Sequence, residues 1–217
     1  MAWGLASLAL AAPGVNPALA QSSSQTQLSL YSSQGQPSAQ VWDSDVGEGF
    51  CRGAQSLTLT VGASAGVAML GGTQHHDLAL AGVTYGRVFG PVLAPNHWYR
   101  GNLEGRIELF GGAQFSPSEQ WIAGLTPHLR YDFATGTPWV PFIDAGAGVT
   151  GTGIGRPDLS GTFEFNLQGC VGTYYFFRNN LAVDIDARLL HLSCARISTP
   201  NLGLNTILGT IGVSWFF

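Results

Sequence analysis

The feature that most constrains this chain is an alternation of apolar and polar residues that returns in segment after segment. Between residues 57 and 67 the odd-numbered positions are apolar, and the even-numbered positions between them are small or polar. A period of two is typical of a β-strand whose side chains point alternately into two different surroundings. The same odd-numbered parity returns near residues 79–85, 103–109, 121–133, 140–149, 163–171, 181–189 and 207–217. The sequence therefore predicts eight strands.

Two architectures can be built from such strands, a soluble β-sandwich and a membrane barrel. Three features favour the barrel: the even number of strands, an export signal at the N-terminus, and an aromatic last strand that ends at Phe217. Apart from the N-terminus, no apolar run reaches the roughly 18 residues that a helical membrane span needs. We therefore expect an all-β, eight-stranded antiparallel transmembrane β-barrel of the bacterial outer membrane over residues 56–217.

The N-terminal part of the chain predicts two further segments. Residues 1–20 contain an apolar stretch, Leu5 to Ala12, followed by the small-residue site Ala18-Leu19-Ala20, which indicates a signal peptide cleaved before Gln21. Residues 21–40 include six Gln and seven Ser, so they offer few side chains for a core. We expect residues 21–55 to be a disordered or loosely attached leader.

Composition argues against a nucleic-acid partner and against a metal site. The chain has no Lys, nine Arg and a net charge of −4, so it has no basic tract for nucleic acid. Cys51, Cys170 and Cys194 follow no metal-ligand spacing and are interpreted as small apolar side chains or free thiols, with a Cys51 disulfide left open. His75 and His76 are interpreted as loop residues rather than metal ligands. No cofactor or metal is expected.

Charged residues alternate with the apolar ones and should therefore face the inside of a narrow barrel, where side chains fill the space. We expect an internal ion-pair network there, with His128 as a further hydrogen-bonding group. Its predicted members are Glu104, Glu108, Asp184 and Asp186 with Arg106, Arg130 and Arg188.

Three polar residues occupy positions where the pattern calls for apolar ones. The odd-numbered face of residues 181–189 continues to His191 and Ser193, and the odd-numbered face of the last segment extends back to Asn205. Side chains at i and i+2 of a strand share a face about 7 Å apart. Polar groups on a lipid face are costly and point to function. With both termini in the periplasm, this group would lie near the extracellular rim, level with lipopolysaccharide.

These residues belong to a pattern that resembles the outer-membrane lipid A 3-O-deacylases of the PagL type. The resemblance is carried by His191-Leu192-Ser193, Ala195, Pro200-Asn201 and Gly203, and upstream by residues 141–146 and Gly148. It implies an eight-stranded barrel that hydrolyses the ester-linked 3-hydroxyacyl chain at position 3 of lipid A. It also implies Ser193 as nucleophile, His191 as general base, and Asn201 with main-chain N–H groups after Ser193 as the oxyanion hole.

The chain departs from the family pattern at three positions. Cys194 and Arg196 stand where the family usually has Asn and Gly, and Asn205 stands where the best-known members have a catalytic glutamate. An amide can orient the imidazole of His191 but brings no charge to stabilise an imidazolium. Two functions therefore stay open, a lipid A esterase and a catalytically weak or inactive structural or adhesive barrel. The expected partner is lipid A of the outer leaflet, and a homodimer is left open.

Overall fold

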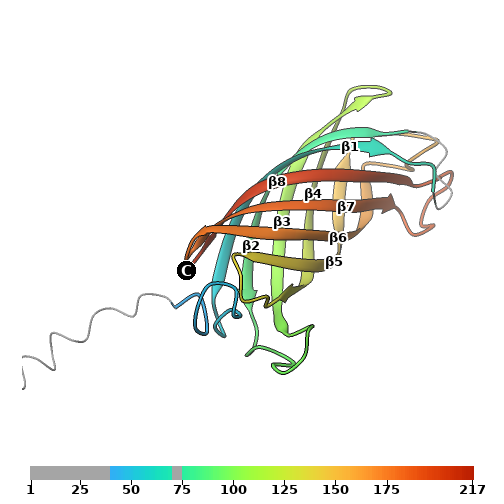
Figure 1. The fold of residues 1–217 in the computed structure, drawn as a ribbon. Helices are drawn as coiled ribbons and strands as arrows, with labels where there is room; N and C mark the ends of the chain where they lie inside the picture. The colour runs from blue at the N-terminus through green and yellow to red at the C-terminus, as the bar shows by residue number, and fades with distance from the viewer. Residues whose placement is uncertain (1–39, 70–74) are drawn as a thin grey trace, which may run out of the picture. The chain divides into compact units, whose positions relative to one another are not determined.

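The computed structural model describes residues 40–69 and 75–217, and its strands form one closed barrel (Figure 1). In chain order the strands are β1 (Gln55–Gly66), β2 (Asp77–Val88), β3 (Gly101–Ser116), β4 (Gln120–Phe133), β5 (Trp139–Thr152), β6 (Phe163–Arg178), β7 (Leu181–Ser193) and β8 (Leu204–Phe216). Each strand pairs antiparallel with the next, and β8 pairs antiparallel with β1 to close the barrel. The predicted fold class and strands are confirmed.

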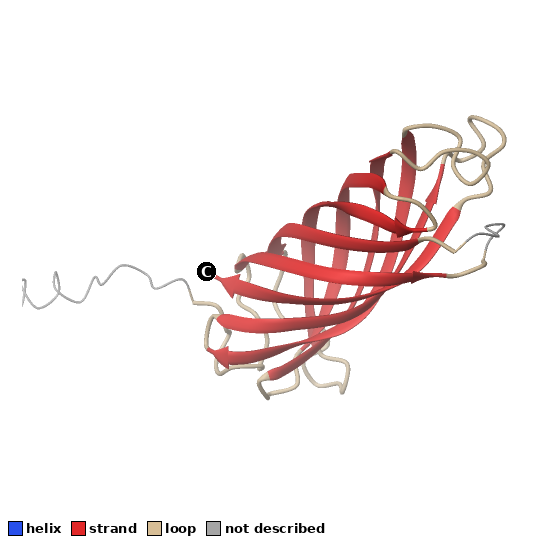
Figure 2. Cartoon of the chain, turned by 90° about the horizontal axis from the view of Figure 1, so that it is seen from above, coloured by secondary structure: helices blue, strands red, loops and turns tan. Residues whose placement is uncertain are grey.

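The outer surface of the barrel is formed by the odd-numbered apolar side chains, as predicted. In β1, Leu59 is 59% exposed and Val61 58%, whereas Thr58 between Leu57 and Leu59 is fully buried toward the inside. Figure 2 shows the strands as a continuous wall with loops at both ends. Because closure leaves no unpaired strand edge, such a wall is stable against hydrocarbon. The described residues contain no helix that is long and apolar enough to cross a membrane.

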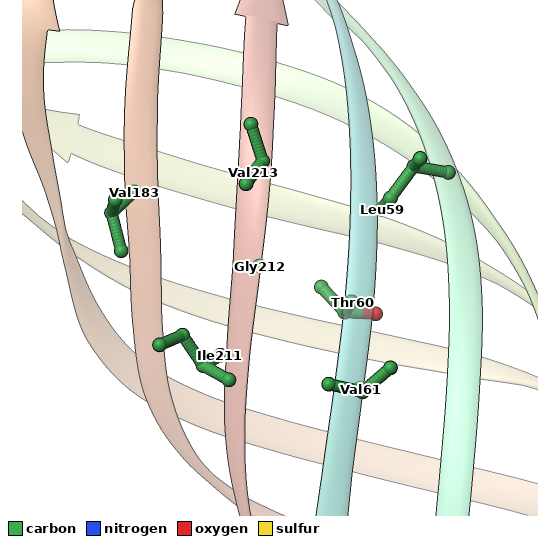
Figure 3. Close-up of a pocket in the computed structure, with 7 residues that line it drawn as sticks. All are labelled: Leu59, Thr60, Val61, Val183, Ile211, Gly212 and Val213. Carbon is green, nitrogen blue, oxygen red and sulfur yellow. The ribbon is translucent and has the colours of Figure 1, made fainter.

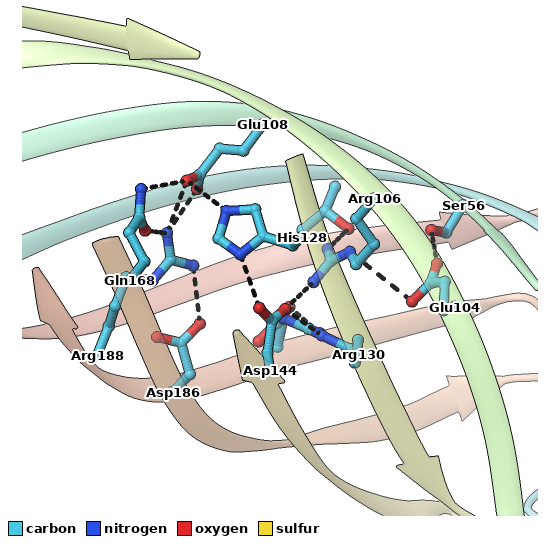
Figure 4. Close-up of polar contacts among 12 residues, drawn as sticks. Ser56, Glu104, Arg106, Glu108, His128, Arg130, Asp144, Gln168, Asp186 and Arg188 are labelled. Carbon is cyan, nitrogen blue, oxygen red and sulfur yellow. Dashed lines mark hydrogen bonds and ion pairs between the residues drawn. The ribbon is translucent and has the colours of Figure 1, made fainter. Parts of the chain in front are cut away.

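The inside of the barrel is polar and most of its charged side chains pair with one another (Figure 4). Arg188 Nη1 lies 2.7 Å from Glu108 Oε1, and Arg130 Nε lies 2.9 Å from Asp144 Oδ2. His128 lies between two carboxylates, 3.4 Å from Glu108 and 2.7 Å from Asp144. Such pairing is required because an isolated charge in this enclosed space would cost several kcal/mol. The predicted network is confirmed, with pairs Arg106–Glu104, Arg188–Glu108, Arg188–Asp186 and Arg130–Asp184.

One end of the barrel is closed by residues 41–54, which precede β1 and pack against the inner face (Figure 1). Trp42 stacks on Phe50 with ring centroids 4.6 Å apart, and Phe50 stacks on Phe216 at 5.0 Å. The main-chain N–H of Phe50 donates to Asn102 Oδ1 over 2.8 Å. This corrects the expectation of a disordered leader as far as residue 55, because its last part buries aromatic side chains. The predicted signal peptide, residues 1–20, and residues 21–39 lie outside the described residues.

The opposite end carries the connections 67–76, 117–119, 153–162 and 194–203, of which residues 70–74 are outside the description. The C-terminus lies at the capped end, so with the termini in the periplasm these four connections face outward. Cys51, Cys170 and Cys194 are all free thiols in the structure.

Candidate active site

The three predicted polar residues meet at the outward-facing ends of β7 and β8. His191 and Ser193 are the last two positions of β7 whose side chains lie on the outer, lipid-facing side of the barrel wall, two residues apart. Asn205 lies in β8 directly opposite His191 in the antiparallel ladder. Residues opposite one another in such a ladder have Cβ atoms about 5 Å apart, so their side chains can bond directly. The alternation along β7 and the register of β7 with β8 thus bring His191, Ser193 and Asn205 together.

His191 bonds to both of the other residues. Its Nδ1 lies 2.7 Å from Asn205 Oδ1, and its Nε2 lies 3.2 Å from Ser193 Oγ. The orientation of the amide follows from a third contact, because Asn205 Nδ2 donates to the main-chain oxygen of Met69 over 2.6 Å. Asn205 Oδ1 therefore accepts a hydrogen from Nδ1 of His191. This leaves Nε2 with a free lone pair toward the hydroxyl of Ser193, which is the arrangement of a general base and its nucleophile.

Asn205 is buried although its position points to the outer face of the barrel. Its exposed fraction is 1%, because residues 67–69 after β1 pack against it. The main-chain N–H of Val67 donates to the main-chain carbonyl of Asn205, and the main-chain oxygen of Met69 accepts from its side chain. His191 and Ser193 are half-buried. The hydroxyl and the imidazole are therefore open to a substrate from the membrane side, whereas the orienting amide is shielded from water.

The turn after Ser193 has an unusual backbone. Ala195 has φ 51° and Arg196 has φ 66°, both in the left-handed region that only a few per cent of non-glycine residues adopt. The main-chain N–H of Ile197 donates to the carbonyl of Cys194 across this turn. Arg196, which stands where the family usually has Gly, thus keeps a glycine-like conformation and presents an exposed side chain.

Asn201, the predicted oxyanion side chain, does not join the other three residues. Its Nδ2 donates to Glu164 Oε2 over 3.0 Å and to Ser160 Oγ over 3.3 Å. These partners belong to β6 and to the connection before it. The structure therefore holds the side-chain N–H groups of Asn201 on the inner side of the rim.

An apolar groove of ≈ 530 Å³ lies on the outer face beside His191. Leu189 and Ile207 pair in the ladder two residues nearer the capped end than His191 and Asn205, and their side chains are on the same outer face. Both residues line the groove. The groove is open because Gly169 and Ala187 are small, and a Cβ added at Gly169 would meet nothing within 4 Å. The full lining is Met69, Asp144, Gly169, Cys170, Val171, Ala187, Arg188, Leu189 and Ile207.

A second apolar hollow of ≈ 380 Å³ lies farther along β8 toward the capped end (Figure 3). Its lining, Leu59, Thr60, Val61, Val183, Ile211, Gly212 and Val213, includes no titratable side chain, so it offers a surface for hydrocarbon and no acid or base. In the described part of the chain, no three His, Cys, Asp or Glu side chains are grouped so as to hold a metal ion.

Two contacts of the site could not be found from the alternation. The carbonyl of Met69 fixes Asn205, and a main-chain contact of this kind leaves no trace in a pattern of side chains. Gly203 lies against His191, where an added Cβ would stand 3.2 Å from the imidazole Cε1. Gly203 belongs to the family pattern, but its contact with the imidazole depends on the fold of residues 194–203.

Comparisons with known proteins bear on the family and the fold of the chain. Residues 80–214 match the family model of lipid A 3-O-deacylase, PagL. The outer membrane enzyme PagL has a similar solved structure, with 20% identity, a TM-score of 0.54, and coverage of 72% of this chain and 97% of that one. Neisserial surface protein A is similar in fold at 16% identity and a TM-score of 0.56, with coverage of 76% and 100%. No curated protein matches significantly. The chain belongs to the PagL family of lipid A 3-O-deacylases and is a β-barrel of the outer membrane.

Proposed function

We propose that this protein removes the ester-linked 3-hydroxyacyl chain from position 3 of lipid A, with Ser193 as nucleophile, His191 as general base and Asn205 as the residue that orients His191. The observation that carries the proposal is the pair of contacts made by one imidazole, 2.7 Å to Asn205 and 3.2 Å to Ser193. A hydroxyl alone is a poor nucleophile, and this arrangement provides the base that removes its proton.

The proposed reaction has two halves. Ser193 Oγ attacks the ester carbonyl while Nε2 of His191 takes the hydroxyl proton, and the imidazolium then returns this proton to the departing sugar oxygen. The acyl chain is left as an ester on Ser193. Water, activated by the same nitrogen, attacks that ester and releases a 3-hydroxy fatty acid and free Ser193.

The negative charge that develops on the carbonyl oxygen needs hydrogen-bond donors, which contribute a few kcal/mol in such sites. We assign this role to main-chain N–H groups of the turn after Ser193, because β7 ends at Ser193 and the turn begins directly after it. The amide of Asn201 can add a donor only after leaving Glu164, to which it is bonded over 3.0 Å.

The substrate is expected to lie along the outer wall. The apolar groove below His191 suits a hydrocarbon chain because Leu189, Ile207 and Val171 line it, and burying each CH₂ contributes about 0.8 kcal/mol. The charged headgroup would then lie above the strand ends, near the exposed side chain of Arg196. This places the ester bond at the level of Ser193.

The alternative function is a structural or adhesive barrel with little or no activity. One observation favours it: the imidazole is paired with the amide of Asn205 and not with a carboxylate, so no negative charge stabilises the imidazolium. The two functions make different predictions about the lipid A of the cell.

Mass spectrometry of lipid A tests the proposal. We would express the chain in a Gram-negative strain that has no 3-O-deacylase and compare wild type, Ser193→Ala and a matched control, Ser198→Ala, which loses a hydroxyl from the same loop. Wild type and Ser198→Ala should release one 3-hydroxyacyl chain, and Ser193→Ala should lose about 10³-fold or more in rate. Heat-modifiable gel mobility would confirm that each barrel is folded. Unmodified lipid A with a folded wild-type barrel would favour the non-enzymatic function.

A further inference from the structure

The end of the loop that follows Ser193 is fastened from inside the barrel mouth. The main-chain oxygen of Asp158, in the connection between β5 and β6, accepts hydrogen bonds from the N–H groups of Leu202 and Gly203, both over 3.0 Å. These two residues immediately precede β8 and Asn205. Asp158 therefore fixes the point at which the chain re-enters the barrel wall.

Gly203 transmits this position to the imidazole. It is buried, has φ +80°, and a Cβ built on it would stand 3.2 Å from His191 Cε1 and 3.4 Å from the carbonyl oxygen of Leu192. The backbone of Gly203 thus lies beside the imidazole with no side chain between them, so a shift of Gly203 toward the ring would press on His191 and a shift away would open a gap beside it. The distance from His191 Nε2 to Ser193 Oγ thus depends on where Gly203 is held.

The side chain of Asp158 reaches across the mouth to His76. The distance from His76 Nε2 to Asp158 Oδ2 is 3.5 Å, and His76 is 2% exposed. His76 Nδ1 lies 2.6 Å from Gln114 Oε1, and Gln114 Nε2 donates to the main-chain oxygen of Ser118 over 2.8 Å. Through this chain of contacts, all four outward-facing connections are linked to one another.

The bonding of Gln114 defines the chemistry of the pair. Because its Nε2 donates to Ser118, its Oε1 faces His76, and Nδ1 of His76 must carry a hydrogen. Nε2 then faces the carboxylate of Asp158 and has no hydrogen-bond partner among residues 40–69 and 75–217. Two acceptors facing one another would repel, so the contact is attractive when Nε2 also carries a hydrogen.

We infer that His76 and Asp158 are a positioning pair, which holds residues 202–203 and thereby keeps His191 at bonding distance from Ser193. Neither residue touches the substrate. The inference rests on the proposed function, since its catalytic consequence requires that His191 and Ser193 perform the deacylation. Its structural consequence, the holding of the loop, can be measured without any turnover.

The loop contains its own reporter of that structural consequence. Trypsin added to intact cells reaches only the outward-facing connections, where Arg156 is protected by Pro157 and Arg196 is followed by Ile197. Cleavage after Arg196 releases residues 197–217 on a denaturing gel. A loop that has lost its attachment opens more often and is cleaved faster.

The experiment compares wild type with Asp158→Ala, His76→Leu and the double variant, together with Asp158→Asn. The matched control is Glu48→Ala, which removes the 2.6 Å ion pair to Arg100 at the capped end. For each barrel that shows heat-modifiable mobility, we would measure the rate of cleavage after Arg196 and the kcat and KM for release of the 3-hydroxyacyl chain from micellar lipopolysaccharide.

We expect both single variants to be cleaved about tenfold faster and to lose about tenfold in kcat, with KM changed less than about twofold. The double variant should be no worse than either single variant, because the two residues act through one contact. Asp158→Asn should stay near wild type, since its amide N–H can donate to a neutral Nε2. Glu48→Ala should match wild type in both measurements.

The outcomes separate the two proposals. If the variants are cleaved faster but wild type releases no acyl chain, the attachment of the loop is supported and the proposed function is overturned. Unchanged cleavage and kcat in Asp158→Ala, with an active wild type, would overturn the positioning pair and leave the function standing. Additive losses in the double variant would also overturn it.

Discussion

His191 and Asn205 are direct partners in the β7–β8 ladder, and their side chains are joined by a hydrogen bond of 2.7 Å from Nδ1 to Oδ1. The backbone register itself thus aligns the base with the residue that orients it. Ser193 comes two residues later on the same strand, so a single strand pair places all three side chains on one face.

Substitution of Asn205 tests whether this bond serves catalysis. Asn205→Leu removes the acceptor and should lower kcat about 100-fold, because the imidazole loses its fixed tautomer. Asn205→Glu adds a negative charge beside the imidazolium and should raise kcat about tenfold. A carboxylate cannot donate to the carbonyl of Met69, so residues 67–69 are expected to move in this variant.

Initial rates of 3-hydroxyacyl release from micellar lipopolysaccharide give the order, which should be Glu above Asn above Leu. Asn96→Leu, an exposed amide at the capped end, serves as the control and should match wild type. An Asn205→Leu variant as fast as wild type would exclude residue 205 from the site.

Gly203→Ala should slow the enzyme without unfolding it. The added Cβ would lie 3.2 Å from His191 Cε1, and φ +80° adds strain of about 1 kcal/mol for a residue with a side chain. We expect kcat to fall about tenfold as the imidazole is displaced. Gly161→Ala, where an added Cβ meets nothing within 4 Å, is the matched control and should keep full activity. Equal rates for the two variants would show that Gly203 does not position His191.

Arg196 should contribute to the recognition of a phosphorylated headgroup. Its side chain is exposed in the loop beside Ser193, and a guanidinium binds phosphate through two parallel hydrogen bonds. Arg196→Ala should raise KM several-fold for bisphosphorylated lipid A and leave KM for dephosphorylated lipid A unchanged. Arg178→Ala, at the capped end, should change neither. If the ratio of KM for dephosphorylated to KM for bisphosphorylated lipid A is the same in Arg196→Ala and wild type, Arg196 does not bind the phosphorylated headgroup.

The internal ion pairs should behave as buried pairs do. Arg188→Met leaves Glu108 without its 2.7 Å partner and should lower the free energy of unfolding by about 3–5 kcal/mol. The double variant Arg188→Met/Glu108→Leu should recover much of this loss, because it also removes the charge of Glu108 and leaves only Asp186, the more distant partner of Arg188 at 3.4 Å, uncompensated. Urea unfolding in detergent micelles measures both. A single variant as stable as wild type would mean that water solvates Glu108 inside the barrel.

Most of the barrel could be predicted from the alternation, because a wall between lipid and a packed lumen imposes a period of two along its whole length. The observed first strand begins at Gln55, one residue before the predicted barrel boundary. Residues 41–54 escaped prediction since Trp42 and Phe50 follow a Gln- and Ser-rich stretch and show no periodicity. Their burial depends on a cavity that exists only after the strands close.

The site was predictable to the extent that the strands place it. Parity placed His191 and Ser193 on one face, and the assumed hairpin placed Asn205 beside them. The direction of Asn201 and the burial of His76 were beyond reach, because both depend on partners in other connections, Glu164 and Asp158. Connections without a period carry no register from which contacts can be read.

Ion pairs line the lumen of the barrel and aromatic rings pack at its capped end, so under the proposed function lipid A would reach Ser193 by lateral diffusion along the outer wall. Encounter is therefore two-dimensional. The reaction rate of a membrane-embedded enzyme of this kind depends on the mole fraction of lipid A in the outer leaflet and not on its bulk concentration. Dilution of lipopolysaccharide with inert detergent at constant total substrate should slow turnover, and the water for hydrolysis must arrive from the headgroup layer above Ser193.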